Sequence, residues 1–304
     1  MKAVTLNDIS KVYGKGKTVA VDKVSFTVNK GELFGLIGPD GAGKTSIFRI
    51  LTTLLLPDGG NATVDGFDVV KDYKKIRKTV GYMPGRFSLY PDLTVEENLH
   101  FFATVFNTTI AENYRLVKDI YIQIEPFKKR RAGKLSGGMK QKLALCCALI
   151  HKPTVLFLDE PTTGVDPVSR KEFWDMLKQL KEQNITIVVS TPYMDEANLC
   201  DRIALIQSGK LLSVDTPASI IRSYPGQLYA VKADNMPALL KVLSKYERVL
   251  SSYAFGEYMH VSFKGEEVDA TEIISYLQEQ KLGGIALEKT VATVEDCFIK
   301  LLKN

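Results

Sequence analysis

One stretch of the sequence has the residue types and the spacing of a phosphate-binding loop. Residues 38–45 read Gly-Pro-Asp-Gly-Ala-Gly-Lys-Thr, which fits the pattern G-x-x-x-x-G-K-[ST]. Glycines let such a loop point backbone N–H groups at phosphate oxygens. Lys44 can reach the β- and γ-phosphates, and the Thr45 hydroxyl can hold Mg²⁺. The predicted phosphate-binding residues are Gly38, Pro39, Asp40, Gly41, Ala42, Gly43, Lys44, Thr45 and Ser46.

Two adjacent acids follow an apolar run further along the chain. Residues 155–158 read Val-Leu-Phe-Leu, and Asp159 and Glu160 come next. Open α/β sheets bind ligands at the C-terminal ends of their strands, so these acids are well placed if the run is a strand. We expect Asp159 to support Mg²⁺ and Glu160 to polarise an attacking water. An apolar strand followed by an acid is common in proteins. The pair indicates a nucleotide site only because the same chain also contains the phosphate-binding loop.

A third element predicts a second phosphate-binding surface. Ser136 precedes Gly137 and Gly138, and a helical pattern then continues to Ile150. Serine is a good helix N-cap, glycines allow close backbone approach, and a helix N-terminus favours anions. A polar turn at residues 161–167, which contains Asp166, directly follows the two acids.

The elements that must position these residues alternate between strand and helix patterns. Apolar runs at residues 33–38, 155–158 and 185–190 predict buried parallel strands, with helical stretches between them. This alternation predicts an α/β fold with a mixed, mostly parallel sheet over residues 1–222. Residues 85–134 lack strong strand signals, so we expect a helical insertion there. Thr94 and Glu97 have the spacing of a capping box, which predicts a helix start.

A second domain is expected over residues 223–304. Strand-like, helical, hairpin-like, helical and strand-like segments follow one another there, with the hairpin turning at Gly256. The order β-α-β-β-α-β is that of a small α+β, ferredoxin-like domain, here with an extra terminal helix. Its sequence has no ligand motif.

Composition limits the function classes. Among 304 residues, 40 are Lys or Arg and 35 are Asp or Glu, and a net charge of +5 does not by itself argue for nucleic acid. The four cysteines and three histidines have neither disulfide-framework nor zinc spacing. We find neither a signal-peptide core at the N-terminus nor an apolar run of membrane-spanning length. We therefore expect a cytosolic chain whose membrane role comes through another polypeptide.

Together the motifs resemble the nucleotide-binding subunit of an ATP-binding cassette (ABC) transporter, a P-loop NTPase family, over residues 1–222. The resemblance implies ATP and Mg²⁺ as ligands and a head-to-tail dimer of two cassettes, identical or different. It implies that Ser136, Gly137 and Gly138 contact ATP held by the partner, and that Asp166 lies between the two sites. Tyr13, in Ser-Lys-Val-Tyr-Gly, matches the aromatic that stacks on adenine.

The same resemblance implies a partner in the membrane. Residues 135–141, 194–197 and 294–299 resemble cassettes of bacterial ABC-2 type drug exporters. An integral membrane permease is then the expected partner, nucleic acid is not, and the chain is expected on the inner face of the cell membrane. A soluble cassette ATPase of translation or DNA maintenance and a nucleotide sensor without turnover remain alternatives.

Two positions depart from the family pattern. Gly85 occupies the place of a glutamine, and Pro192 occupies that of a histidine. Proline has neither a side-chain donor nor a backbone N–H, so we expect this chain's own ATP site to hydrolyse slowly while it completes a competent site on a different cassette. The alternative is a homodimer in which Arg86 or Tyr193 takes over a role. His151, by contrast, is expected to cap a helix end.

Overall fold

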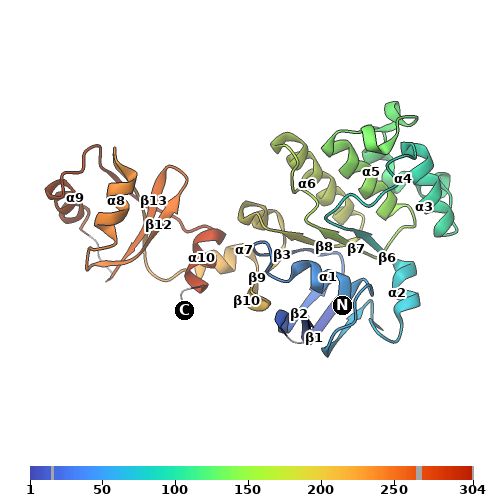
Figure 1. The fold of residues 1–304 in the computed structure, drawn as a ribbon, viewed down its shortest axis with the longest axis horizontal. Helices are drawn as coiled ribbons and strands as arrows, with labels where there is room; N and C mark the ends of the chain where they lie inside the picture. The colour runs from blue at the N-terminus through green and yellow to red at the C-terminus, as the bar shows by residue number, and fades with distance from the viewer. Residues whose placement is uncertain (15–16, 265–268, 303–304) are drawn as a thin grey trace. The chain divides into compact units, whose positions relative to one another are not determined.

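The computed structural model describes residues 1–14, 17–264 and 269–302. The chain divides into two compact units, Met1–Ala218 and Ser219–Asn304 (Figure 1). The boundary expected from the sequence, at residue 222, lies close to this division. Within the described ranges, none of the helices is long and apolar enough to span a bilayer.

The first unit contains a six-stranded sheet in the order β10-β9-β3-β8-β7-β6. Neighbours from β9 to β6 pair in parallel, whereas β10 is antiparallel to β9. Every residue of β3, β7 and β8 is buried, and burial on both faces accounts for the apolar runs within these strands. The predicted mixed, mostly parallel sheet is confirmed. The strands are β10 (Lys210–Asp215), β9 (Arg202–Gln207), β3 (Leu33–Ile37), β8 (Thr186–Thr191), β7 (Val155–Asp159) and β6 (Val80–Met83).

A second, antiparallel sheet in the order β2-β1-β4-β5 was not anticipated from the sequence. Helix α1 (Lys44–Leu51) packs between the two sheets, and their apolar residues form one continuous core. The Phe48 ring meets that of Phe157 edge-on at 5.8 Å, so the helix is locked against β7. The strands are β1 (Lys2–Tyr13), β2 (Thr18–Asn29), β4 (Gly59–Val64) and β5 (Phe67–Asp68).

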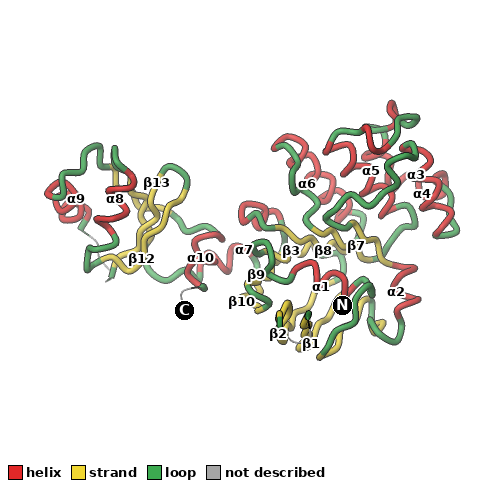
Figure 2. Tube along the Cα trace, viewed as in Figure 1, coloured by secondary structure: helices red, strands yellow, loops and turns green. Residues whose placement is uncertain are grey.

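The helical insertion expected at about residues 85–134 is present, and Figure 2 shows its helices gathered with α5. The predicted capping box is confirmed: Thr94 Oγ1 accepts a hydrogen bond from the Glu97 N–H, and Glu97 Oε2 accepts one from the Thr94 N–H. The remaining helices and 3-10 turns are α2 (Tyr73–Thr79), α3 (Val95–Val105), α4 (Ile110–Tyr121), η1 (Glu125–Phe127), η2 (Ala132–Lys134), α5 (Gly137–Leu149), α6 (Pro167–Glu182), η3 (Met194–Leu199) and α7 (Pro217–Arg222).

The second unit has the element order that the sequence predicts. Its four strands pair antiparallel throughout in the order β12-β13-β11-β14, and residues from α8 and α9 share its apolar core. This is the arrangement expected of a ferredoxin-like domain with one additional helix, α10. The elements are β11 (Leu228–Lys232), α8 (Met236–Leu243), β12 (Val249–Phe255), β13 (Tyr258–Phe263), α9 (Ala270–Glu279), β14 (Ala286–Thr290) and α10 (Val294–Leu301).

Helix α10 is joined to the hairpin β12–β13 through one buried carboxylate. Asp296 Oδ1 accepts hydrogen bonds from the Tyr253 hydroxyl and from His260 Nδ1, the latter at 2.6 Å. Asp296 Oδ2 accepts two more from Thr293, which completes the capping box of α10. Burial by itself raises the pKa of Asp296, but these hydrogen bonds outweigh it and hold that pKa below its ordinary value.

We predict that Asp296→Asn loosens α10 in a pH-dependent way. A carboxyl whose pKa is lowered by folding adds stability above the unfolded pKa of about 4, and this stability is lost as pH falls through the folded pKa. Hydrogen exchange of the α10 amides in the full chain should show local opening made easier by about 1–3 kcal/mol at pH 7. The gap to wild type should shrink below pH 4. Exposed Glu295→Gln is the control, and equal protection of α10 in all three proteins at pH 7 would contradict the prediction.

Candidate active site

The phosphate-binding loop predicted from the sequence connects β3 to α1 at the C-terminal edge of the parallel sheet. Gly43, the N-cap of α1, has φ of 104°, and a Cβ there would lie 2.2 Å from the Ala20 carbonyl oxygen. Only glycine fits such a position. The loop borders an open cavity of about 240 Å³ lined by Ala20, Gly41, Ala42, Gly43, Lys44, Thr45, Ser46 and Glu160.

Lys44 is buried at the base of this cavity. Its ammonium donates to the carbonyl oxygens of Gly38, at 2.7 Å, and Pro39, at 2.9 Å. It also forms an ion pair with Glu160 Oε1 at 3.0 Å. The structure therefore brings the predicted lysine and the predicted carboxylate into direct contact.

The two acids at the end of β7 are held by Ser190, on the adjacent strand β8. The Ser190 hydroxyl donates to Asp159 Oδ1 at 2.7 Å. The Glu160 N–H donates to both the carbonyl oxygen and the hydroxyl oxygen of Ser190, and Glu160 itself has a left-handed backbone with φ of 49°. Sequence reasoning treated Ser190 only as a strand end. A hydroxyl at the end of the neighbouring strand was the signal that could have revealed its role.

The oxygen donors here suit Mg²⁺. The described residues contain no group of three His, Cys, Asp or Glu side chains that could hold a metal by themselves. Magnesium is usually bound by one or two carboxylates together with substrate phosphates and water. The hydroxyl of Thr45 beside the loop and the buried carboxylate of Asp159 fit that kind of site.

Tyr13 lies beside the phosphate-binding loop. Its hydroxyl is 3.2 Å from Ser46 Oγ, which fixes the end of the ring. The side chain stays 39% exposed, so an aromatic surface is left for a planar ligand.

The glycine-rich helix start and the polar turn form a separate cluster. Ser136 caps α5, as predicted, and accepts a hydrogen bond from the Met139 N–H. Asp166 caps α6 and accepts one from the Ser169 N–H, which lowers the pKa of Asp166. A Cβ on Gly138 would lie 2.8 Å from Ser169 Oγ, so the two helix starts touch. None of these residues lines the cavity beside Lys44.

Both departures from the family pattern lie close to the two acids. A Cβ on Gly85 would be 3.0 Å from the Asp159 carbonyl oxygen, so any side chain there crowds the β7 end. Pro192 directly follows β8, and the next residue, Tyr193, donates its N–H to Thr191 Oγ1.

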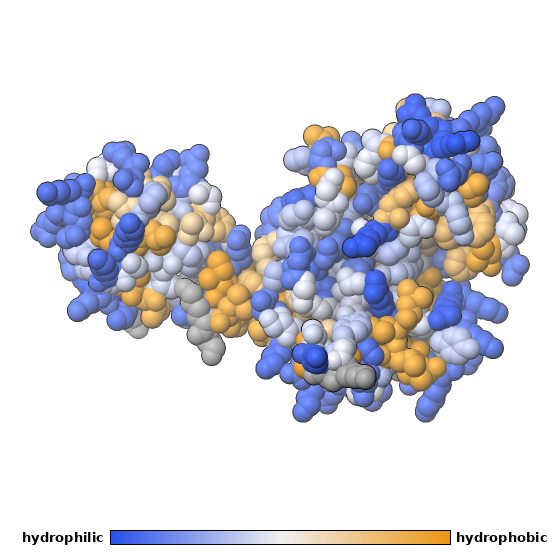
Figure 3. All heavy atoms as spheres, in the orientation of Figure 1, coloured by the Kyte–Doolittle hydropathy of each residue, from blue (hydrophilic) through white to orange (hydrophobic). Residues whose placement is uncertain are grey.

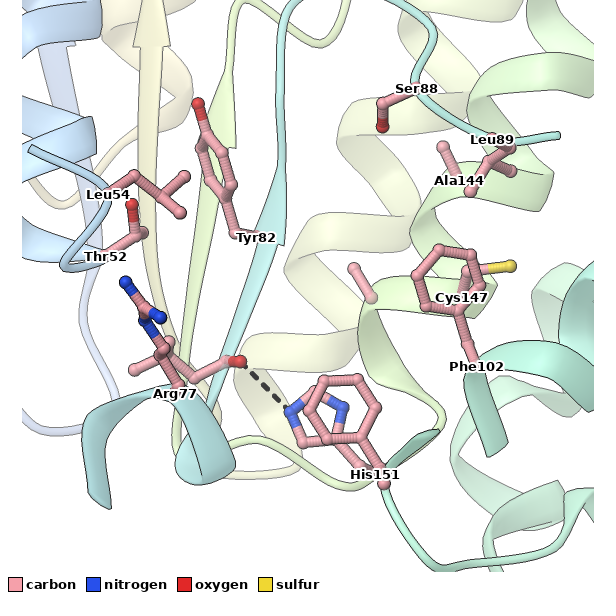
Figure 4. A pocket seen from close by; sticks show the side chains of 13 residues that line it. Thr52, Leu54, Arg77, Tyr82, Ser88, Leu89, Phe102, Ala144, Cys147 and His151 are labelled. Carbon is pink, nitrogen blue, oxygen red and sulfur yellow. Dashed lines mark hydrogen bonds between the residues drawn. The ribbon is translucent and has the colours of Figure 1, made fainter. Parts of the chain in front are cut away.

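A further pocket, of about 200 Å³, was not predicted (Figure 4). Thr52, Leu54 and Tyr82 line one side of it, and residues of α3, α5 and the loop before α3 line the other. Burial raises the pKa of Tyr82 to about 12, and the charge of Asp159 adds to that shift.

His151 closes the base of this pocket, and its predicted role as a helix cap is wrong. Its Nε2 donates to the Val80 carbonyl oxygen at 3.0 Å, and its ring stacks on Phe106. Burial lowers the pKa of His151, so the ring joins β6 to the helical insertion as a neutral group.

Comparison with known proteins identifies the family to which this chain belongs. A family model described as ABC transporter matches residues 21–163. The Nod factor export ATP-binding protein I of a Rhizobium species is 32% identical over 311 residues, which cover 98% of this chain and 96% of that protein. The chain belongs to the ABC transporter family. ABC ATPases bind ATP and generally hydrolyse it.

Other relatives agree on the family. The probable multidrug ABC transporter ATP-binding protein YbhF of Escherichia coli is 38% identical over 304 residues, and the chain spans about half of its length, 52%. The solved dimeric ATP-binding cassette MJ0796, in a post-hydrolysis state with ADP and Pi, is 25% identical with a TM-score of 0.63. The match covers 70% of this ABC chain and 98% of MJ0796.

The contact of Gly138 with Ser169 predicts different effects for two adjacent glycines. Gly138→Ala should be less stable than Gly137→Ala by about 1–3 kcal/mol in free energy of unfolding, because only at residue 138 does the new methyl group overpack a contact. Gly137→Ala is the matched control, since the nearest atom to a Cβ there is 4.0 Å away. Urea unfolding without nucleotide measures both, and equal stabilities would contradict the prediction.

Proposed function

We propose that this chain is the ATP-binding subunit of an exporter-type ABC transporter, which couples ATP hydrolysis to a separate membrane permease. The observation that carries the proposal is the contact between Lys44 and Glu160 in a loop cavity, with the helix start at Ser136 held apart from it. Relatives named for multidrug and Nod factor export support the exporter class over a soluble ATPase of translation or DNA maintenance.

In this proposal, ATP binding rearranges the partners of Lys44. The ammonium exchanges carbonyl and carboxylate oxygens for phosphate oxygens, while loop N–H groups and the N-terminus of α1 bind the remaining phosphate charge. Release from Lys44 frees Glu160 to accept a proton from the attacking water. Thr45 and Asp159 would hold Mg²⁺, which offsets phosphate charge, and Tyr13 would stack on the adenine.

The second cluster serves a neighbouring cassette in this proposal. Ser136, Gly137 and Gly138 present a helix N-terminus that suits the phosphates of an ATP bound to another subunit. Asp166 caps the adjacent helix at the same surface. A head-to-tail dimer, of this chain with itself or with a different cassette, would place each cluster against the other subunit's loop.

The pocket in Figure 4 is the surface that we assign to the permease. Its lining is mainly apolar, with Leu54, Leu89, Phe102 and Phe106 around a single arginine, Arg77. Leu54 is 57% exposed, and Figure 3 shows hydrophobic surface gathered beside α2 of this unit. Exposed apolar surface of this kind suits a protein partner. The chain would then act on the inner face of the cell membrane.

The proposal is tested by Glu160→Gln in the complex purified with its permease. The substitution removes the charge that pairs with Lys44, so Mg-ATP should bind at least as tightly as to wild type. Phosphate release by this chain's own ATP site should fall by about 10²–10⁴-fold because its base is lost. Calorimetry and phosphate release measure the two quantities, with exposed Glu182→Gln as control. If neither the wild-type protein nor Glu160→Gln binds Mg-ATP, the proposed function is wrong.

We also propose that this chain's own ATP site hydrolyses slowly, because Pro192 offers no hydrogen-bond donor there. This proposal makes a separate prediction. Pro192→His should raise phosphate release by this chain's own site by about 10²-fold, because one donor toward the developing charge is supplied. Gly85→Gln should increase the rate further only if the Asp159 carbonyl group can move away from the new Cβ. Gly85→Ala adds that Cβ without the amide and so measures the effect of the crowding alone. Ordinary turnover by a wild-type homodimer, with little gain from Pro192→His, would favour the alternative in which Arg86 or Tyr193 takes over a role.

A further inference from the structure

The segment that carries Pro192 is fastened at both ends to the segment that carries Glu160. At the first tie, Ser190 accepts the Glu160 N–H at its carbonyl and hydroxyl oxygens. At the second tie, the Thr162 hydroxyl donates to Glu196 Oε1 at 2.8 Å. Residues 190–196 and 160–162 therefore form a closed double loop at the C-terminal ends of β8 and β7.

Glu196 is an unusual residue for the second tie, because its carboxylate is only 1% exposed. Its Oε1 accepts a hydrogen bond from the Thr162 hydroxyl and forms an ion pair with Arg170 Nε of α6 at 3.2 Å. Its Oε2 has no hydrogen-bond partner among the described residues. A buried ion pair contributes little net stability compared with apolar packing, so stability alone is a weak reason for a carboxylate here.

Arg170 holds the same segment at two further points. One terminal nitrogen of its guanidinium donates to Asp195, and its Cζ lies 4.7 Å from the centroid of the Tyr193 ring. Arg170 therefore contacts three of the four residues at 193–196. Its helix, α6, begins at Pro167 directly after the turn that follows Glu160, so the same side chain ties the Pro192 segment to that turn.

We propose that Thr162, Arg170 and Glu196 form a positioning clamp for ATP hydrolysis, which keeps Glu160 aligned when residue 192 offers no hydrogen-bond donor. The inference rests on the proposed function. Without the clamp, the hydrogen bonds between Ser190 and Glu160 are the only ones of these contacts that still hold the two segments together. A small displacement of the catalytic base would then lower the rate of hydrolysis. Only an arginine can serve Glu196 and Asp195 from one planar group.

The test uses the complex with permease and measures kcat and KM for ATP together. Arg170→Met should lower kcat about tenfold and leave KM within about twofold. The reason is that the clamp aligns Glu160 but does not contact the phosphate-binding loop. Lys178→Met is the matched control, since Lys178 is an exposed cation on the same helix. Rates are normalised to the bound Mg-ATP per chain, so that loss of folded protein does not count as loss of rate.

Two milder substitutions at Thr162 test the clamp even if the Arg170→Met variant does not fold. Thr162→Val keeps the side-chain shape and removes the hydroxyl donor, so kcat should again fall with KM little changed. Thr162→Ser restores the donor and should recover most of that loss. Wild-type kcat in Arg170→Met and Thr162→Val, or a rise in KM without a fall in kcat, would overturn the clamp. Absence of Mg-ATP turnover in wild type would instead overturn the proposed function.

Discussion

The contact between Lys44 and Glu160 is the constraint on which the rest of the structure depends. A lysine ammonium that is only 2% exposed must have oxygen partners. Two of them are carbonyl oxygens of its own loop, and the third is the carboxylate of Glu160, which directly follows β7. The three-way arrangement requires β3 and β7 to end at the same edge of one sheet. It also requires a glycine at the N-cap of α1, so that the loop can pass the Ala20 carbonyl.

Strand β8 makes this arrangement possible because it lies between β3 and β7. Its last residues supply Ser190, which aligns the backbone of Glu160 and the carboxylate of Asp159. The segment that follows supplies Glu196, which reaches the turn after Glu160 through Thr162. One strand therefore sets both the position of the acids and the path of the loop that contains Pro192. The departures at Gly85 and Pro192 lie against the same two strand ends.

In the second unit, too, one residue holds several elements in place. Asp296 caps its own helix and also accepts hydrogen bonds from two side chains of the hairpin. One carboxylate fixes both the start of α10 and its position on the sheet of that unit. The sequence predicts the order of these elements well, because each carries its own strand or helix periodicity.

The sequence by itself determined the phosphate loop, the two acids, the capped starts of α3 and α5, and the order of the C-terminal elements. These features depend on residue types at short spacing, where backbone geometry and capping chemistry act locally. Only the tertiary structure decided that Ser190 holds both acids, that His151 bonds to Val80 instead of capping its helix, that Gly138 touches Ser169, and that Glu196 joins three segments. Each of these contacts links residues separated by about 26 positions or more in the chain. Local periodicity has no information about such pairs, because they meet only once the strands have been ordered in a sheet.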